Sequence, residues 1–343
     1  MSTPVSPLMN PPRSTILALG VAAARRFWLT PARPDFAAFL RLALATLALL
    51  QLAVLWPHLL ELYGNYGLVQ WAVVEVSNNA WVPSIGKVAL VAADLGVDSA
   101  TTVHVLFGLY GLALVGLLLG YRTRAFAVAA WLLHGVTLNS GFFSLYGVDT
   151  MMHILFFYLV FSPAGAKWSL DAHLGRGSAE PGAGARIALR LLQVHLCIIY
   201  LNTGLAKVAG EQWRSGEAIW RAVMQPQFNV FDFSWLPAHP LVAMVIAWSV
   251  LFIELGYAVL IWIPRLRRPT LWATIAMHAG IALSMRLWLF SMVMIAFNLT
   301  AFGWAALATR PVRAKSEAKD ETKDGAKDVA NGQASGELAL ASS

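Results

Sequence analysis

Eight long apolar segments constrain this chain more than any other feature of its sequence. They lie at about residues 36–56, 102–120, 125–146, 149–163, 185–207, 240–263, 269–286 and 288–309. A helix that crosses the hydrocarbon core of a bilayer needs roughly 20 residues, and most of these segments approach that length. Only 13% of the 343 residues are charged, about half the share found in soluble domains. We therefore predict an all-α, polytopic integral membrane helical bundle with about eight transmembrane helices in a lipid bilayer.

The distribution of basic residues predicts how the bundle is oriented. If the N-terminus is cytoplasmic, all but five of the 25 lysines and arginines fall on the cytoplasmic side, the exceptions being Lys87, Lys207, Arg214, Arg221 and Arg286. Cytoplasmic loops of membrane proteins carry this excess of positive charge. We expect both termini in the cytoplasm. We attribute the net charge of +7 to the orientation of the protein in the membrane, and we expect no nucleic-acid partner. One cysteine and a composition rich in alanine and arginine favour a bacterial inner membrane.

The same pattern divides the chain into three parts. Residues 1–35 form a proline- and arginine-containing cytoplasmic segment, residues 36–310 form the transmembrane domain, and residues 311–343 form a charged tail without apolar periodicity, which we expect to be disordered. Two long outer connections, 57–101 and 208–239, are rich in tryptophan and poor in charge. Tryptophan favours the membrane–water interface, so we predict short interfacial helices there, on the outer side.

Three polar residues at the outer ends of the apolar segments are candidate catalytic groups: Lys207, His153 and Asp149. Asp149 and His153 are four residues apart, so on a helix they share a face and can pair. A lysine at membrane depth is costly and marks a functional candidate. Three interpretations of Lys207 remain open: an ion pair with Asp149 or Glu254, an amine that reaches the outer interface, or a catalytic base.

Five further residues are candidates for binding a ligand: His195, Tyr200, Trp213, Glu254 and His278. Polar groups in an apolar span need a partner or a water-filled cavity. The alternatives are an interface anchor for Trp213 and a hydrogen-bonded core histidine for His278. No histidine or cysteine spacing typical of a metal site occurs, and no nucleotide-binding motif, so we expect no metal.

Four stretches, in the same order, carry a family resemblance: Tyr158-Leu-Val-Phe161 with Trp168-Ser-Leu-Asp171, Tyr200-x3-Gly204-x2-Lys207 with Trp213 and Gly216, Phe252-Ile-Glu254-Leu-Gly, and His278 with Phe290 and Met294. Together they resemble the horizontally transferred transmembrane (HTTM) domain proteins, bacterial relatives of the vitamin K-dependent γ-glutamyl carboxylase. The resemblance covers residues 36–309.

The resemblance implies a role for Lys207. In the carboxylase, the aligned lysine is the base that activates reduced vitamin K, which implies a reduced quinone as cofactor. The carboxylase's second catalytic group, a histidine, falls near Val148 and Asp149 here, and His153 is the nearest histidine. The chain also ends soon after its last span, where the carboxylase continues into a domain that recruits its protein substrate. Both differences favour quinone- or lipid-linked chemistry over carboxylase-like lyase or ligase chemistry on a protein.

Two functional hypotheses remain. In the first, an outward-facing polar cavity binds or acts on a quinone- or lipid-like small molecule, and enzymatic activity stays open. In the second, the protein is a non-enzymatic membrane scaffold for a protein partner, and its polar residues hold helices together. A transporter is the least favoured alternative, because no inverted repeat is visible in the sequence.

Overall fold

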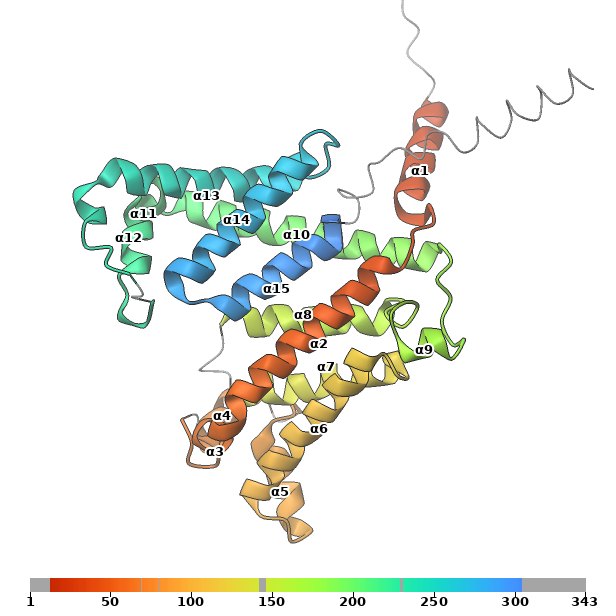
Figure 1. Cartoon of the computed structure of the whole chain (residues 1–343), viewed down its shortest axis with the longest axis vertical. Helices are drawn as coiled ribbons and strands as arrows, with labels where there is room; N and C mark the ends of the chain where they lie inside the picture. Colours follow the sequence, from red (N-terminus) through yellow and green to blue (C-terminus); the bar gives the residue numbers. More distant parts are fainter. Residues whose placement is uncertain (1–12, 69, 80, 142–145, 229–230, 304–343) are drawn as a thin grey trace, which may run out of the picture. The chain divides into compact units, whose positions relative to one another are not determined.

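The described part of the chain is helical. The computed structural model describes residues 13–68, 70–79, 81–141, 146–228 and 231–303, and every regular element in these ranges is a helix (Figure 1). A single isolated bridge joins Ala32 and Gly182. The all-α prediction is therefore confirmed. The tail at 311–343, predicted to be disordered, lies outside the described residues.

A helix lies at each of the eight predicted apolar segments. These are α2 (Asp35–Leu55), α6 (Ser99–Leu119), α7 (Thr123–Ser140), α8 (Gly147–Phe161), α10 (Ala183–Ala209), α13 (Pro240–Leu260), α14 (Arg267–Met285) and α15 (Trp288–Asn298), which continues as a π-turn, η5 (Leu299–Gly303). Among the described residues, length and hydropathy select four of them as membrane spans: Asp35–Tyr63, Ser99–Leu119, Ala183–Ala209 and Pro240–Leu260. The helices at Gly147–Phe161 and Trp288–Gly303 are apolar but shorter. The chain is an integral membrane protein.

The helices pack in two groups that meet along α15, α8 and α10 (Figure 1). In the first group, α6 lies against α2 and α7, and α8 lies against α7 and α2. In the second, α13 lies between α10 and α14, and α15 follows α14. The interior is filled by large apolar side chains, among them Phe36, Phe107, Phe156 and Phe297. The outward faces also carry exposed apolar side chains, as a lipid-facing surface requires.

Short helices occupy the two long connections, as the sequence predicts. The first connection contains η1 (Trp56–His58), α3 (Leu59–Tyr63), α4 (Trp71–Ser77) and α5 (Ile85–Asp94), and the second contains α11 (Glu211–Arg214), α12 (Glu217–Val223), η3 (Pro226–Phe228) and η4 (Leu236–Ala238). The remaining elements are α1 (Arg13–Leu29) and α9 (Leu170–His173). Both lie at the ends of the long helices that face away from these two connections (Figure 1).

A buried arginine binds together the end of the bundle that carries α9. The Arg41 side chain of α2 has no exposed surface. It donates to five main-chain carbonyl oxygens, those of Leu117, Leu118, Ala164, Lys167 and Trp168. The carbonyls at the C-terminal end of a helix lack partners within the helix, so the guanidinium supplies the donors that the end of α6 needs.

The Trp168-Ser-Leu-Asp171 stretch completes this connection. Asp171 accepts hydrogen bonds from the amide of Arg122 (2.9 Å) and from the amide and hydroxyl of Thr123 (both 2.7 Å), which fixes the start of α7. Ser169 begins α9 by accepting from the amide of Ala172 (3.0 Å). Gly120 has φ +68°, and a Cβ there would lie 2.3 Å from the Cβ of Ser169, so only glycine fits. The stretch that carries the family resemblance therefore has a structural role.

We expect Asp171→Asn to lower the free energy of unfolding at neutral pH by about 1–3 kcal/mol, and with it the melting temperature, because an amide cannot accept from all three donors. Burial would raise the pKa of Asp171, but the hydrogen bonds from Thr123 and Arg122, with the charge of Arg176, hold it below 3.8. A lowered folded-state pKa gives stability that is present above the unfolded pKa and is lost as the pH falls through the folded value. Melting curves in detergent at neutral and acid pH test this. An unchanged acid dependence in the variant would contradict it.

Candidate functional site

An ion pair between α10 and α13 contains the central candidate of the sequence. The Lys207 ammonium contacts Oε1 of Glu254, and the Lys207 side chain is 25% exposed while that of Glu254 is 7% exposed. The same Nζ lies 5.2 Å from the ring centroid of Trp213, at a distance typical of a cation–π interaction. Of the two candidate partners of Lys207, the structure therefore places Glu254 beside it.

The Tyr200-x3-Gly204-x2-Lys207 spacing explains how this pair forms. Residues four and seven apart share a face of a helix, so these three residues face the same neighbour. At Gly204 that neighbour is α13, since an added Cβ would lie 2.9 Å from the side chain of Leu255 and 3.2 Å from Cβ of Glu254. The glycine thus allows the close helix approach that places Glu254 beside Lys207.

Tyr200 begins a second group of contacts, which is buried. Its hydroxyl lies 2.8 Å from Nε2 of His278 and accepts from Nδ2 of Asn298 (2.8 Å). Tyr257 donates to Oδ1 of the same asparagine (2.7 Å). The Tyr200 hydroxyl therefore links the Asn298 amide to the His278 imidazole. These four residues join α10, α13, α14 and α15.

Two buried atoms in this region lack a hydrogen-bond partner. They are Oε2 of Glu254 and Nδ1 of His278. A buried polar atom without a partner costs free energy, and such atoms occur where a ligand or water completes a site. Through the contacts of Lys207 and Tyr200, this region contains five of the eight candidate residues: Tyr200, Lys207, Trp213, Glu254 and His278.

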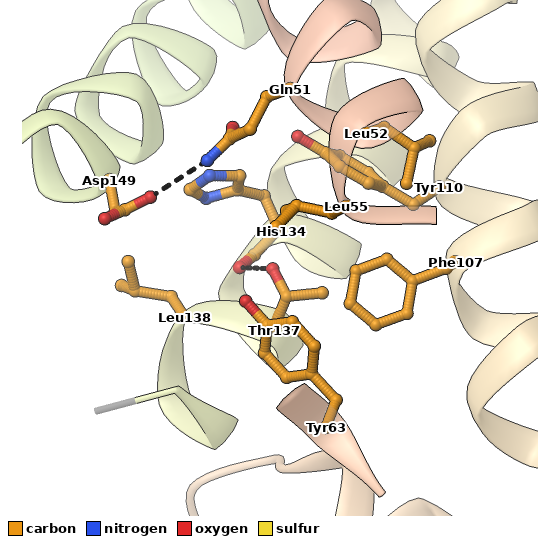
Figure 2. Close-up of a pocket in the computed structure, with 10 residues that line it drawn as sticks. All are labelled: Gln51, Leu52, Leu55, Tyr63, Phe107, Tyr110, His134, Thr137, Leu138 and Asp149. Atoms are coloured by element: carbon orange, nitrogen blue, oxygen red, sulfur yellow. Dashed lines mark hydrogen bonds between the residues drawn. The ribbon is translucent and has the colours of Figure 1, made fainter. Parts of the chain in front are cut away.

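The other polar centre is a hollow at the opposite end of α2 from Arg41 (Figure 2). Its cavity volume is about 20 Å³, roughly the space of one water molecule, and it is partly open to the outside. Its walls are formed by α2, α3, α6, α7 and α8 through Gln51, Leu52, Leu55, Tyr63, Phe107, Tyr110, His134, Thr137, Leu138 and Asp149. Figure 2 shows the Asp149 carboxylate facing Gln51, whose Nε2 donates to it over 3.2 Å. The hollow therefore combines aromatic walls with a carboxylate, an imidazole and phenols.

Asp149 and His153 do not make the contact expected from their spacing. The second oxygen of Asp149 accepts from the amide of Tyr146 (3.2 Å), so the carboxylate caps the first turn of α8. The His153 ring instead stacks between Trp131 (5.6 Å between centroids) and His134 (5.5 Å). A four-residue spacing brings two side chains to one face, but the helix N-terminus offers Asp149 a better partner.

The three candidate catalytic residues make their contacts on two different sets of helices. Among the described residues, Asp149 and His153 have contacts on α2, α7 and α8, whereas Lys207 contacts α11 and α13. His195 belongs to neither group, because its Nδ1 pairs with the Tyr158 hydroxyl (2.9 Å) between α8 and α10.

Several residues of the two centres were not among the sequence candidates: Gln51, Tyr63, Tyr110, His134, Tyr257 and Asn298. His134 and Asn298 stand out in the sequence as polar groups within apolar segments. Tyrosine does not, because its ring suits an apolar span. Spacing along one helix cannot show which other helix supplies the partner.

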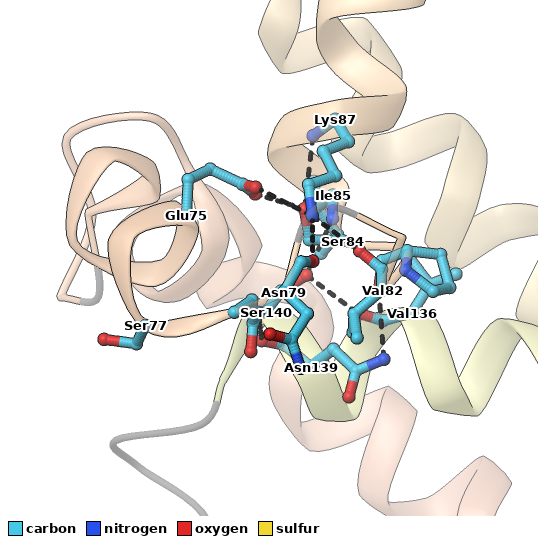
Figure 3. A network of polar contacts seen from close by, with 12 residues as sticks. Glu75, Ser77, Asn79, Val82, Ser84, Ile85, Lys87, Val136, Asn139 and Ser140 are labelled. Carbon is cyan, nitrogen blue, oxygen red and sulfur yellow. Dashed lines mark hydrogen bonds and ion pairs between the residues drawn. The ribbon is translucent and has the colours of Figure 1, made fainter.

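A continuous polar network lies beside the hollow, where α7 ends (Figure 3). Ser84 caps α5 and donates to Glu75, and Lys87 pairs with the same carboxylate (3.1 Å). Ser140 accepts from the amide of Ile85 (2.7 Å), and Asn139 donates to a carbonyl of the same loop. These contacts fix the α4–α5 connection against the end of α7, whose previous turn lines the hollow.

Comparison with known proteins bears on the whole arrangement. No curated protein and no solved structure matches this chain. A family model described as the HTTM domain matches residues 93–312, which include α6–α8, α10, the Lys207–Glu254 pair and the Tyr200 group. This match extends over more than half of the chain and agrees with the resemblance drawn from its motifs. The chain therefore belongs to the HTTM domain family.

Proposed function

We propose that this protein is a multi-pass HTTM membrane protein whose hollow faces the outer side and binds a lipid-soluble molecule with a polar ring, such as a quinone. All eight long helices cross the membrane in this proposal, and residues 36–310 form the domain. The bias of 20 of the 25 basic residues toward one side supports cytoplasmic termini. That orientation places the hollow at the outer face of a bacterial inner membrane.

The observation that carries the binding proposal is the composition of the hollow. Leu52, Leu55, Phe107 and Leu138 supply an apolar wall, and Tyr110 places a hydroxyl there that is buried and has no hydrogen-bond partner. Ligand sites in proteins are mostly apolar, with a few polar groups that orient the ligand. The lining side chains would have to move apart to admit a flat ring, whose carbonyl oxygen would then accept from Tyr110 while the ring contacts Phe107.

The hollow also contains groups that could handle a proton. His134 lines the hollow and stacks on His153, with their Nδ1 atoms 3.4 Å apart. Asp149, which is on the same helix as His153, also lines the hollow. Quinone reduction and oxidation exchange protons along with electrons, so these side chains suit a quinone or its reduced form. Whether turnover follows binding is a separate question.

The Lys207–Glu254 pair supports a second candidate function, a non-enzymatic scaffold. The Lys207 ammonium contacts a carboxylate of the neighbouring helix and so joins α10 to α13. In this alternative the pair and the Tyr200 group hold α10, α13, α14 and α15 in a fixed arrangement that a partner protein recognises.

Extraction of the purified protein followed by mass spectrometry of lipid-soluble molecules tests the binding proposal, with added 2-methyl-1,4-naphthoquinone as the probe. We expect Tyr110→Phe to weaken binding of the probe about fivefold, since it removes one hydrogen bond. Leu138→Trp should abolish binding by filling the hollow. Tyr66→Phe, on an 89% exposed tyrosine, is the matched control. Equal probe binding by wild type and Leu138→Trp would refute the proposal.

A further inference from the structure

A basic groove lies between α1 and the first turns of α10, at the opposite end of α10 from Lys207. It is lined by Ala23, Arg26, Phe27, Thr30, Arg186 and Arg190, and its volume is about 400 Å³, much of it open to the surroundings. Three of its six lining residues are arginines. Arg267, at the start of α14, also lies within electrostatic range of Arg190.

The described residues supply no ion-pair partner for the positive charge of this groove. Among the described residues, no carboxylate forms an ion pair with Arg26, Arg186 or Arg190; the acidic groups in ion pairs have other basic partners. Like charges close together repel one another, and in a structure they call for an anion from outside the chain. The groove therefore has the charge of an anion site.

Two of the arginines are held in position by other contacts. Arg186 donates from Nε to the carbonyl of Thr30 (2.6 Å) and from Nη2 to that of Pro31 (3.3 Å). Arg190 lies over the ring of Phe27, with Cζ 4.2 Å from its centroid, and donates from Nε to the Phe27 carbonyl (3.1 Å). A guanidinium has five N–H donors, so each side chain keeps donors for a further acceptor. Fixed donors lose little entropy when they bind.

The position of the groove selects the kind of anion. Arg186 and Arg190 lie in the first turns of a candidate membrane span that begins at Ala183, which is the level of the lipid headgroups. On the same turns, Ile187 is 38% exposed and Leu191 is 44% exposed, and they give an acyl chain an apolar surface. Basic pockets between helices at this level bind the phosphates of anionic lipids.

We propose that this groove binds the headgroup of an anionic phospholipid. The phosphodiester lies between Arg26 on α1 and Arg186 on α10, and an acyl chain runs along Ile187 and Leu191. The lipid thereby holds α1 against α10. A nucleic acid is disfavoured, because bases and backbone would have to enter the headgroup layer.

Native mass spectrometry of the full-length protein, released from mixed micelles of phosphatidylglycerol and phosphatidylcholine with the same acyl chains, tests this proposal. We expect wild type to retain one phosphatidylglycerol in preference to phosphatidylcholine. Each arginine near the headgroup contributes to this preference by about fivefold. The variant Arg26→Gln/Arg186→Gln should lose about 30-fold of it. Arg124→Gln, which removes an exposed arginine at the first turn of α7, is the matched control.

Three outcomes would overturn the proposal. One is equal retention of the two lipids by wild type. Another is an unchanged preference in the double variant, with its melting temperature showing that it is folded. The third is complete displacement of phosphatidylglycerol by a millimolar excess of inorganic phosphate, which would identify a site for free phosphate instead of a lipid.

Discussion

Replacing Arg41 by methionine is expected to lower the stability of the protein by roughly 4 kcal/mol, because the change leaves several buried carbonyl oxygens without a donor. Methionine replaces only the aliphatic part of the side chain, so the unfilled space of the guanidinium adds to the loss. The five carbonyls that Arg41 contacts belong to the end of α6 and to the segment before α9. Both segments should therefore loosen together.

The measurement is the melting temperature in detergent, followed by tryptophan fluorescence, together with the yield of folded protein. Arg41→Lys should fall between wild type and Arg41→Met, since an ammonium has three donors and lacks the planar fork. Arg124→Met, at an exposed arginine near the same end of the bundle, should change stability by no more than about 0.5 kcal/mol. If Arg41→Met and Arg124→Met melted alike, the carbonyl contacts of Arg41 would contribute nothing to stability.

Arg41 also shows what the sequence could and could not predict. The charge pattern assigns it correctly to the same end of the bundle as the α6–α7 turn, but it treats Arg41 as one of several loop charges. The structure buries it completely within the bundle. Its partners are main-chain carbonyls, which are present at every residue and leave no mark in the sequence. Helix positions follow from apolar segments; contacts with carbonyls do not.

For the candidate site too, the sequence predicts which residues matter but not which residues they contact. The sequence identifies Lys207, Glu254, Tyr200 and His278 as candidates because polar groups in apolar spans are costly, and it identifies Trp213 through the family resemblance. It cannot choose between Asp149 and Glu254 as the partner of Lys207, since that choice depends on which helices are neighbours. Gly204 allows α13 to approach α10 closely, and this makes Glu254 the partner of Lys207. The hollow is harder to predict, because tyrosines and leucines that line a cavity look like those that fill a core.

Replacing Lys207 by methionine is expected to destabilise the protein by about 3–5 kcal/mol, because Glu254 would remain buried without its positive partner. Glu254→Leu should cost less, since the Lys207 ammonium is partly exposed and can turn toward the interface. In the double variant Lys207→Met/Glu254→Leu neither charge is left unpaired, so we expect its stability to return close to that of wild type. Arg221→Met breaks an exposed pair with Glu217 and should cost less than about 1 kcal/mol.

The double variant also separates the two candidate functions. If the pair serves only to join α10 and α13, restored stability should be accompanied by unchanged binding of 2-methyl-1,4-naphthoquinone and by unchanged partner binding. If Lys207 acts on a ligand, as the resemblance to the carboxylase implies, the double variant should melt like wild type and yet lose turnover of the reduced quinone. A double variant that remained as unstable as Lys207→Met would contradict the ion-pair account itself. The stability of the double variant therefore tests the geometry, and its activity tests the chemistry.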